Sequence, residues 1–545
     1  MKLQYTLTLW YSILLVCCVG CAEYIQTVQL TPHKAYSLPL SPTQHWIPSR
    51  VQYKKFDNGK EIVWMWDFSN YEIVVYDYPS GEMNKTIPVQ LFGNKRDFCL
   101  SIDWHGYDSI FVMTNAAYHS NYWHDSTIFL IDTLGSVQEV YDVSTAPVWT
   151  SSRPEIDKDS VYYFWGSDAT QMSFQDGKLT LFLVRYGMGV GDSLFQHPPT
   201  KVAGFLDISG QTDTFMFANA HVPSKPSVYF PRPASKALGF MNSDSTLLYR
   251  FQHLPTIFEE NIKTGDLRQY ELPSYVFDSL PPLSSAEYLP HHQRPRMKYF
   301  YGSLAYDPYK ELYINILGYP FSNPENAPKN FQAKRGIILF DKSFQKVAEG
   351  LLPESYVGNF FITPKGLGLL DISRSSVAED SIYFTIFDYQ YNQQSREDYK
   401  KMAVLEAPTI KPGGWTAYLQ DSYAIQDQKS IVLFAPADLG CDGCLDYMIS
   451  YFKEESNRSK QDGLYCIIAA ENERILNKKL YSHNLTKDHP NLLLDSSGEF
   501  LSYVGRDFRQ GLLLFVEQGE VTAQTSIIPS QLSGLPGLID NYLKE

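Results

Sequence analysis

Two cysteines three positions apart, Cys441 and Cys444 in the stretch GCDGCLDYM, are the residues of this sequence best suited to chemistry. An apolar run over residues 430–435 precedes them and an amphipathic pattern follows, which predicts a strand leading into a helix that begins at the pair. A cysteine at a helix N-terminus lies at the positive end of the helix dipole, which stabilises the thiolate and lowers the pKa of the thiol. The pair could therefore exchange disulfides, form a structural disulfide or hold a metal.

A metal site has less support than a dithiol, because a structural zinc site needs four ligands and the sequence has no second CxxC and no suitable histidine pair. We expect no metal and no cofactor. Other polar clusters in the chain lack the spacing of a known metal or hydrolase motif, so we expect them in turns and on the surface. Their members are Asp103, His105, Asp108, His119, His124, Asp125, His291 and His292.

From about residue 426 to 545, strand-like and helix-like patterns alternate and then give way to two strands joined by the turn EQGE and a final helix over 529–543. This order resembles the extracytoplasmic thioredoxin-like proteins. The residues that carry the resemblance are Cys441-Asp442-Gly443-Cys444 at the start of a helix and the segment LLLDSSGEF. The resemblance implies that Cys441 is the attacking thiol and Cys444 the resolving thiol.

The sequence departs from the thioredoxin-like pattern at three places. Leu433 stands about where many thioredoxins carry a buried acid, and the carboxylate of Asp442 opposes formation of a thiolate beside it. Where that family has a proline facing the dithiol, this chain has Gln510 and Gly511. A structural disulfide therefore stays open as the alternative to exchange.

The N-terminus has the pattern of an export signal over residues 1–20, with Lys2 followed by an apolar run that is shorter than the roughly 20 residues of a membrane span. The apolar run ends in small residues before a cysteine, Val19-Gly20-Cys21. This stretch resembles the lipobox of bacterial lipoproteins, although Cys18 replaces the usual leucine. The resemblance implies lipidation of Cys21, a tether over 21–44 and a lipid-anchored envelope protein. We expect the outer membrane, with the periplasmic and surface-facing sides both open. An uncleaved anchor or a secreted protein is the alternative.

The composition limits the partners. A formal net charge of −14 and the lack of a long basic run argue against nucleic acid. Of the cysteines left after removal of the signal, Cys99 and Cys466 lie in apolar strand-like runs, and we expect both to be buried and unreactive.

From about residue 45 to 400, a hairpin pattern recurs in which an apolar strand ends in Asp or Asn, a short turn follows and a second strand begins. The repetition predicts a β-propeller of six or seven irregular blades, with a large two-sheet β structure as the alternative. Pro408, Pro412, Gly413 and Gly414 indicate a linker over 401–425. The residues that mark the recurring turn are Asp77, Asp132, Asp207, Asn261 and Asp341.

Segments of this middle part resemble an uncharacterised propeller-like lipoprotein family of Bacteroidota. They are LAYDPYKELYINI, SIFVMTN and STIFLIDTLGSV. The resemblance implies a propeller-like fold and an envelope location, and it implies no known activity.

The combined expectation is an envelope-anchored lipoprotein in which a propeller binds a glycan, a peptide or another partner. Its thioredoxin-like domain would exchange disulfides with a protein thiol or disulfide. The alternative is a non-enzymatic binding or scaffold lipoprotein with a structural disulfide. A propeller enzyme is a third possibility, but no paired carboxylates indicate one.

Overall fold

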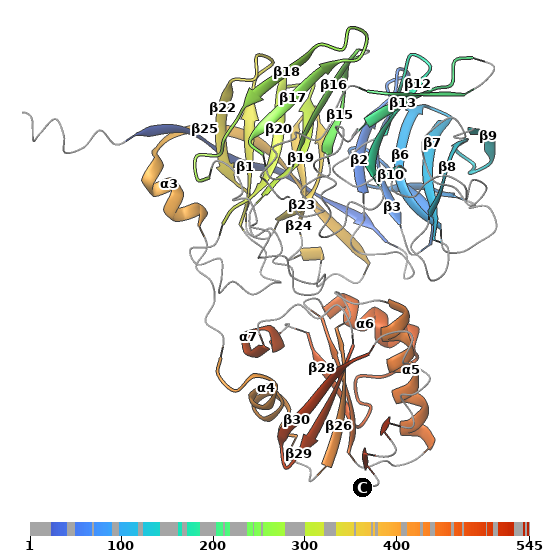
Figure 1. Cartoon of the computed structure of the whole chain (residues 1–545), viewed down its shortest axis with the longest axis vertical. Helices are drawn as coiled ribbons and strands as arrows, with labels where there is room; N and C mark the ends of the chain where they lie inside the picture. The colour runs from blue at the N-terminus through green and yellow to red at the C-terminus, as the bar shows by residue number, and fades with distance from the viewer. Residues whose placement is uncertain are drawn as a thin grey trace, which may run out of the picture. The chain divides into compact units, whose positions relative to one another are not determined.

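The computed structural model divides the chain into two compact units (Figure 1). We call them the N-terminal unit, residues 1–320, 333–371 and 382–405, and the C-terminal unit, residues 321–332, 372–381 and 406–545. The structure describes residues 23–40, 50–67, 70–89, 97–117, 124–141, 162–165, 172–185, 203–210, 213–218, 237–243, 245–251, 254–277, 300–320, 334–353, 356–371, 374–375, 380–404, 411–425, 429–436, 442–458, 463–470, 473–496, 499–504, 511–527, 538–539 and 542–543.

Four sheets of the N-terminal unit are antiparallel and follow one another along the chain. The first has β2 (Arg50–Lys55), β3 (Glu61–Asp67), β4 (Glu72–Asp77) and β5 (Met83–Pro88). The second has β6 (Asp97–Gly106), β7 (Ser109–Ala117), β8 (His124–Ile131) and β9 (Val137–Tyr141). The third has β10 (Tyr162–Trp165), β11 (Ser173–Gln175), β12 (Lys178–Arg185), β13 (Ala203–Asp207) and β14 (Thr214–Phe217). The fourth has β15 (Ala237–Ser243), β16 (Thr246–Phe251), β17 (Thr256–Asn261) and β18 (Leu267–Glu271).

A fifth sheet has eight strands in the order β19-β20-β21-β22-β1-β25-β24-β23. One half is an antiparallel run of β19 (Phe300–Asp307), β20 (Leu312–Gly318), β21 (Arg335–Phe340) and β22 (Lys346–Leu351). The other half has β23 (Tyr356–Thr363), β24 (Gly366–Asp371), β25 (Ser381–Ser395) and β1 (Tyr24–Pro39). A parallel pairing of β1 with β22 joins the halves.

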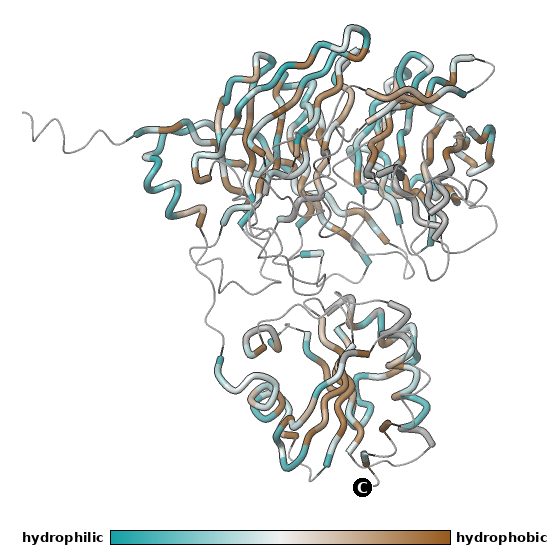
Figure 2. The backbone as a smooth tube through the Cα atoms, in the orientation of Figure 1, coloured by the Kyte–Doolittle hydropathy of each residue, from teal (hydrophilic) through white to brown (hydrophobic). Residues whose placement is uncertain are grey.

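Consecutive sheets pack face to face, and this makes the arrangement propeller-like. In β16, Leu247 and Tyr249 face a core cluster shared with the third sheet, while Leu248 faces one shared with the eight-stranded sheet. Both faces of the strand are therefore buried, as alternating side chains of a strand between two sheets must be. Strand β2 of the first sheet contacts β23 of the last group, which closes the series. The brown stretches in Figure 2 follow these strands.

The residues that mark the recurring turn occupy the same place in five groups of strands, at the end of the strand that comes before the last one of the group along the chain. These strands are β4, β8, β13, β17 and β21. Asp132 and Asp341 each accept a backbone N–H two residues ahead, at 2.8 Å from Leu134 and 2.8 Å from Ser343. Asp207 and Asn261 make the equivalent contact, and Asp77 instead accepts the side-chain amide of Asn84. The predicted repetition is confirmed at these five positions, and the predicted bond from side chain to backbone is confirmed at four of them, all except Asp77.

Two segments predicted as irregular contain regular elements. Strand β1 occupies most of the expected tether, because Ile25, Val28 and Leu30 are buried in the sheet cores. The expected linker contains the end of α3 (Arg396–Ala403) and the whole of α4 (Gly414–Tyr423). Helix α3 is capped by the Ser395 side chain, which accepts the N–H of Asp398.

The C-terminal unit is an α/β structure with a five-stranded sheet in the order β28-β27-β26-β29-β30. β26 (Lys429–Pro436), β27 (Leu464–Ala469) and β28 (Leu492–Asp495) are parallel, while β29 (Leu512–Glu517) and β30 (Glu520–Ser526) form an antiparallel hairpin beside β26. Helices α5 (Asp442–Arg458) and α6 (Glu473–Ser482) share one core cluster with the sheet, and α4 and α7 (Phe500–Val504) share another. The strands and the two helices predicted between residues 429 and 526 are confirmed, whereas most of the predicted helix over 529–543 lies outside the described residues.

Among the described residues, the structure has no helix with the length and apolar character needed to cross a bilayer.

Candidate functional site

The predicted dithiol lies at the junction of β26 and α5. β26 is the central strand of its sheet, and α5 begins at Asp442, so Cys444 is in the first turn of the helix and Cys441 directly precedes it in the chain. Cys441 and the side chain of Cys444 lie outside the described residues, as does Cys21. The described backbone therefore places Cys444 at a helix N-terminus, where the helix dipole favours a thiolate.

The segment before β29 approaches the same helix. Gly511 is buried against Met448, and a Cβ atom added at Gly511 would lie 2.0 Å from the Met448 sulfur. Met448 is one helical turn beyond Cys444, so Gly511 packs near the first turns of α5. The Phe434–Leu512 pairing also brings the start of β29 to the end of β26 from which the chain continues toward the cysteines. Gln510 itself lies outside the described residues.

The sheet beneath the motif is apolar where thioredoxins often carry an acid. Leu433 is fully buried in β26, within the core cluster that includes Met448 of α5. The described acid at this edge of the sheet is Asp495, which ends β28 two strands away from β26. Its carboxylate accepts the Tyr418 hydroxyl at 2.9 Å and the N–H groups of Glu499 and Phe500 at 3.0 Å each. Asp495 therefore fixes the start of α7 to α4.

Cys466 is buried in β27, as predicted, and is not in a disulfide. Burial raises the pKa of its thiol to about 12, because the thiolate would lose its hydration. Such a thiol is a poor nucleophile and is unsuited to act as a resolving cysteine for the motif. The side chain of Cys99, in β6, lies outside the described residues.

In the native chain at pH 8, we expect iodoacetamide to alkylate Cys466 about 10³-fold more slowly than an exposed cysteine peptide. The reason is that only about one thiol in 10⁴ is ionised at a pKa near 12. Mass spectrometry of tryptic peptides after timed labelling measures the rate, and the same chain in urea is the control. Rapid labelling of the folded chain would show that the thiol is accessible.

Asp103 and Asp108, two acids of the polar clusters noted in the sequence, have structural roles. Asp103 accepts the N–H of Phe174 at 2.7 Å and so joins the second sheet to the third, and Asp108 accepts both the N–H and the hydroxyl of Thr133 at 2.7 Å. The two Thr133 bonds lower the pKa of Asp108, whereas burial raises that of Asp103. His105 is exposed at the edge of the Phe174 ring. The side chains of His119, His124, Asp125, His291 and His292 lie outside the described residues.

Among the described residues, no group of three or more His, Cys, Asp or Glu side chains is placed to hold a metal ion.

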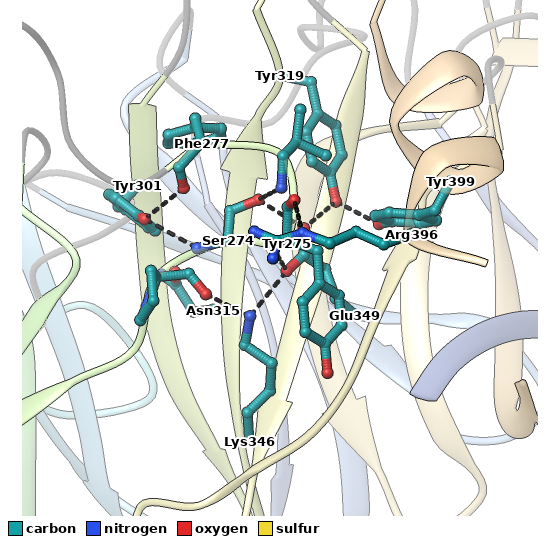
Figure 3. A network of polar contacts seen from close by, with 12 residues as sticks. Ser274, Tyr275, Phe277, Tyr301, Asn315, Tyr319, Lys346, Glu349, Arg396 and Tyr399 are labelled. Atoms are coloured by element: carbon teal, nitrogen blue, oxygen red, sulfur yellow. Dashed lines mark hydrogen bonds and ion pairs between the residues drawn. The ribbon is translucent and has the colours of Figure 1, made fainter. Parts of the chain in front are cut away.

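The N-terminal unit contains a buried polar cluster that centres on Glu349 of β22 (Figure 3). The Glu349 carboxylate is fully buried and accepts the hydroxyl of Ser274 at 2.6 Å and the N–H of Tyr275 at 2.8 Å. It also accepts the hydroxyl of Tyr319 at 3.0 Å and the ammonium of Lys346 at 3.1 Å. The carboxylate is thus paired and saturated, so it fixes residues 272–277 to the sheet.

Aromatic residues extend the Glu349 cluster on both sides. The hydroxyls of Tyr319 and Tyr399 lie 2.5 Å apart, and burial raises the pKa of both tyrosines. The Tyr301 hydroxyl accepts the N–H of Ser274 at 3.0 Å, and the buried guanidinium of Arg250 lies 4.1 Å from the Tyr301 ring centre. Tyr399 belongs to α3, so the cluster also holds that helix against the sheet.

Sequence reasoning did not identify the Glu349 cluster. The local signal is a single acid in the apolar run KVAEGLL, which is weak because its partners come from segments as far as 75 positions away. A fully buried carboxylate indicates either function or structural cross-linking. Here every contact of the carboxylate is to groups of the fold itself.

The geometry thus defines a propeller-like unit joined to an α/β unit that carries a CxxC motif at a helix start. No protein-family model matches the sequence, and no curated protein matches it. Among solved structures, a member of the DUF4221 family from Bacteroides vulgatus is similar, with 16% identity, a TM-score of 0.53, and coverage of 67% of this chain and 99% of that chain. This likeness supports the propeller-like fold, and its source agrees with the predicted resemblance to a Bacteroidota family. It bears on no activity.

Two other solved structures are more distant. A luciferin-regenerating enzyme has 11% identity and a TM-score of 0.34, and covers 65% of this chain and 95% of its own. A GH93 α-L-arabinofuranosidase of Fusarium graminearum has 7% identity and a TM-score of 0.36, and covers 65% and 97%. Both TM-scores are too low to indicate the fold or the function of this chain.

Proposed function

We propose that the C-terminal unit is a thioredoxin-like domain that exchanges disulfides through Cys441 and Cys444. The observation that supports this most is the place of the motif, since α5 begins at Asp442 directly after the central strand β26. The close packing of Gly511 on Met448 adds support, because it brings the segment before β29 to the same helix. This is the place where the thioredoxin-like resemblance puts a substrate-facing segment.

The proposed reaction has two steps. The Cys441 thiolate attacks one sulfur of a partner disulfide, which breaks that S–S bond and releases one partner thiolate. The Cys444 thiolate then attacks the Cys441 sulfur, which releases the second partner thiolate and leaves Cys441–Cys444 oxidised. The partner gains two electrons and the dithiol loses two. The same steps in reverse would oxidise a partner dithiol.

We further propose that the N-terminal unit is a six-bladed propeller that binds the partner, a glycan or a peptide, and that Cys21 anchors the chain to an envelope membrane. Six groups of four or five strands support this blade number, since the eight-stranded sheet consists of two four-stranded groups joined through β1 and β22. In this arrangement β1, the first described strand, completes the last blade.

The test of exchange is the reduction potential of the Cys441–Cys444 pair, together with turnover of a disulfide substrate. We expect a potential between about −120 and −270 mV, the range of working thiol–disulfide catalysts. Cys441→Ser should reduce turnover to the uncatalysed rate, and Cys444→Ser should accumulate a mixed disulfide because the resolving thiol is missing.

Cys466→Ser is the matched control, because this buried thiol should leave turnover unchanged. A pair with a potential below about −300 mV, together with no turnover, would instead identify a structural disulfide in a binding or scaffold lipoprotein.

A further inference from the structure

The first described residue is clamped to the N-terminal unit. The guanidinium of Arg396, at the start of α3, donates to the two carboxylate oxygens of Glu23 at 3.2 and 3.0 Å. The backbone N–H of Arg396 also donates to the Glu23 carbonyl at 2.8 Å. Arg396 donates further to the carbonyl of Tyr275, which neighbours the Glu349 cluster, at 3.0 Å. One side chain therefore joins the chain start, α3 and the buried cluster.

Strand β1 follows Glu23 directly. β1 starts at Tyr24, and Ile25 is only 5% exposed within a core cluster. One residue, Ala22, separates Glu23 from Cys21. Since an extended chain spans at most about 3.6 Å per residue, the Cα atom of Cys21 lies within about 7 Å of that of Glu23. A lipid on Cys21 would have no free tether between it and the folded unit.

From these contacts we propose that the bilayer surface lies directly against one edge of the N-terminal unit, formed by Glu23, Tyr24 and helix α3. We call this the anchor edge. The inference rests on the proposed lipidation of Cys21 and adds the face that meets the lipid. The short connection keeps Glu23 and its surroundings close to the bilayer, because acyl chains inserted in the bilayer hold Cys21 at its surface.

The side chains of the anchor edge suit a lipid headgroup region. Tyr24 is 69% exposed and Met402 of α3 is 44% exposed, although both are large and apolar in part. Tyrosine is favoured at membrane–water interfaces, where its ring meets the acyl boundary and its hydroxyl meets water.

Charges of both signs accompany these side chains, so the contact should not need anionic lipid. The acidic residues are Glu23, Glu397 and Asp398. The basic residues are Arg396, Lys400, Lys401 and Lys334. The ammonium of Lys334 donates to the Met402 carbonyl at 2.9 Å. We therefore expect the arrangement in vesicles of neutral phosphatidylcholine.

The test uses the full-length lipidated chain in phosphatidylcholine vesicles that contain lipids spin-labelled near the headgroup. Cys99, Cys441 and Cys444 are replaced by serine, and buried Cys466 is kept. A fluorophore is placed at Met402→Cys or, as the matched control, at Leu134→Cys, which is 78% exposed in the turn between β8 and β9 of another sheet. Figure 1 draws that turn on the opposite side of the unit from α3.

We expect several-fold stronger quenching at position 402 than at position 134. Inserting a flexible 20-residue Gly/Ser segment between Ala22 and Glu23, with a span of about 25 Å, should bring position 402 down to the level of position 134. Equal quenching at both positions in membrane-bound protein, or no effect of the insertion, would contradict the proposal that the anchor edge meets the bilayer. Either result would leave the lipidation of Cys21 standing. Recovery of the chain in the soluble fraction would overturn lipidation, and this inference with it.

Discussion

Replacing Glu349 with alanine is expected to lower the free energy of unfolding of the N-terminal unit by about 3–5 kcal/mol. The substitution leaves the Lys346 ammonium, only 13% exposed, without its carboxylate, and leaves the hydroxyls of Ser274 and Tyr319 buried without their acceptor. Urea unfolding followed by tryptophan fluorescence measures the change, because Trp64 and Trp66 are buried in this unit.

Glu349→Gln is the matched control for this change. Glutamine keeps one acceptor oxygen of similar shape but not the charge that pairs with Lys346, so we expect a loss smaller than that of the alanine variant. A loss below about 1 kcal/mol for Glu349→Ala would mean that water or neighbouring groups replace the carboxylate, and that the cluster does not hold residues 272–277.

Gly511→Ala is expected to destabilise the C-terminal unit by about 1–3 kcal/mol, the usual cost of overpacking. Its new Cβ would overlap the Met448 sulfur at 2.0 Å and approach Met448 Cε at 2.8 Å. Hydrogen exchange of β26 and β29 amides in the full chain measures the loss for this unit separately. Gly106→Ala is the control, since its Cβ would meet only Ser109 atoms at an ordinary 3.5 Å.

A double-mutant cycle tests whether Met448 is the cause. Met448→Ala alone should cost about 2–5 kcal/mol through the cavity it leaves. The double variant Met448→Ala, Gly511→Ala should lose at least about 1 kcal/mol less stability than the sum of the two single losses. The reason is that the methyl group of the new alanine at position 511 enters the space that the methionine left. Strict additivity would show that the two residues do not compete for one space.

The fold of both units follows from local patterns that are strong in this chain. The turn carried by Asp132 and its counterparts needs only a short polar side chain and its own backbone, so it is readable from a few residues. Leu433 and its neighbours form an almost completely buried strand that is followed by a helical pattern, and this alternation predicted the α/β unit. The place of β1 was missed because its pairing partners are hundreds of positions away, and isolated strands resemble extended tethers.

The candidate sites also differ in whether their residues are neighbours in the sequence, and only the local one could be predicted. Cys441 and Cys444 were found from spacing alone, because a CxxC motif before an amphipathic helix is a local signal. The Glu349 cluster was not found, since its contacts join segments that are far apart in the sequence. The hydrogen bonds between Arg396 and Glu23 join residues that are 373 positions apart, and the sequence around neither residue indicates them. Only long-range pairing reveals such contacts.

The position of β1 also governs the order of folding. Thr27 of β1 donates to the carbonyl of Asn392, which lies 365 positions later. The first described strand of the chain therefore waits for β25, the last described strand of its unit, before its sheet is complete, and such non-local closure is slow. Until β22 is made, this 16-residue strand has two unpaired edges, and one edge stays unpaired until β25 follows, which leaves the strand open to aggregation. A chain that stops before β25 would leave the eight-stranded sheet incomplete, so synthesis through Ser395 is a condition for a complete N-terminal unit.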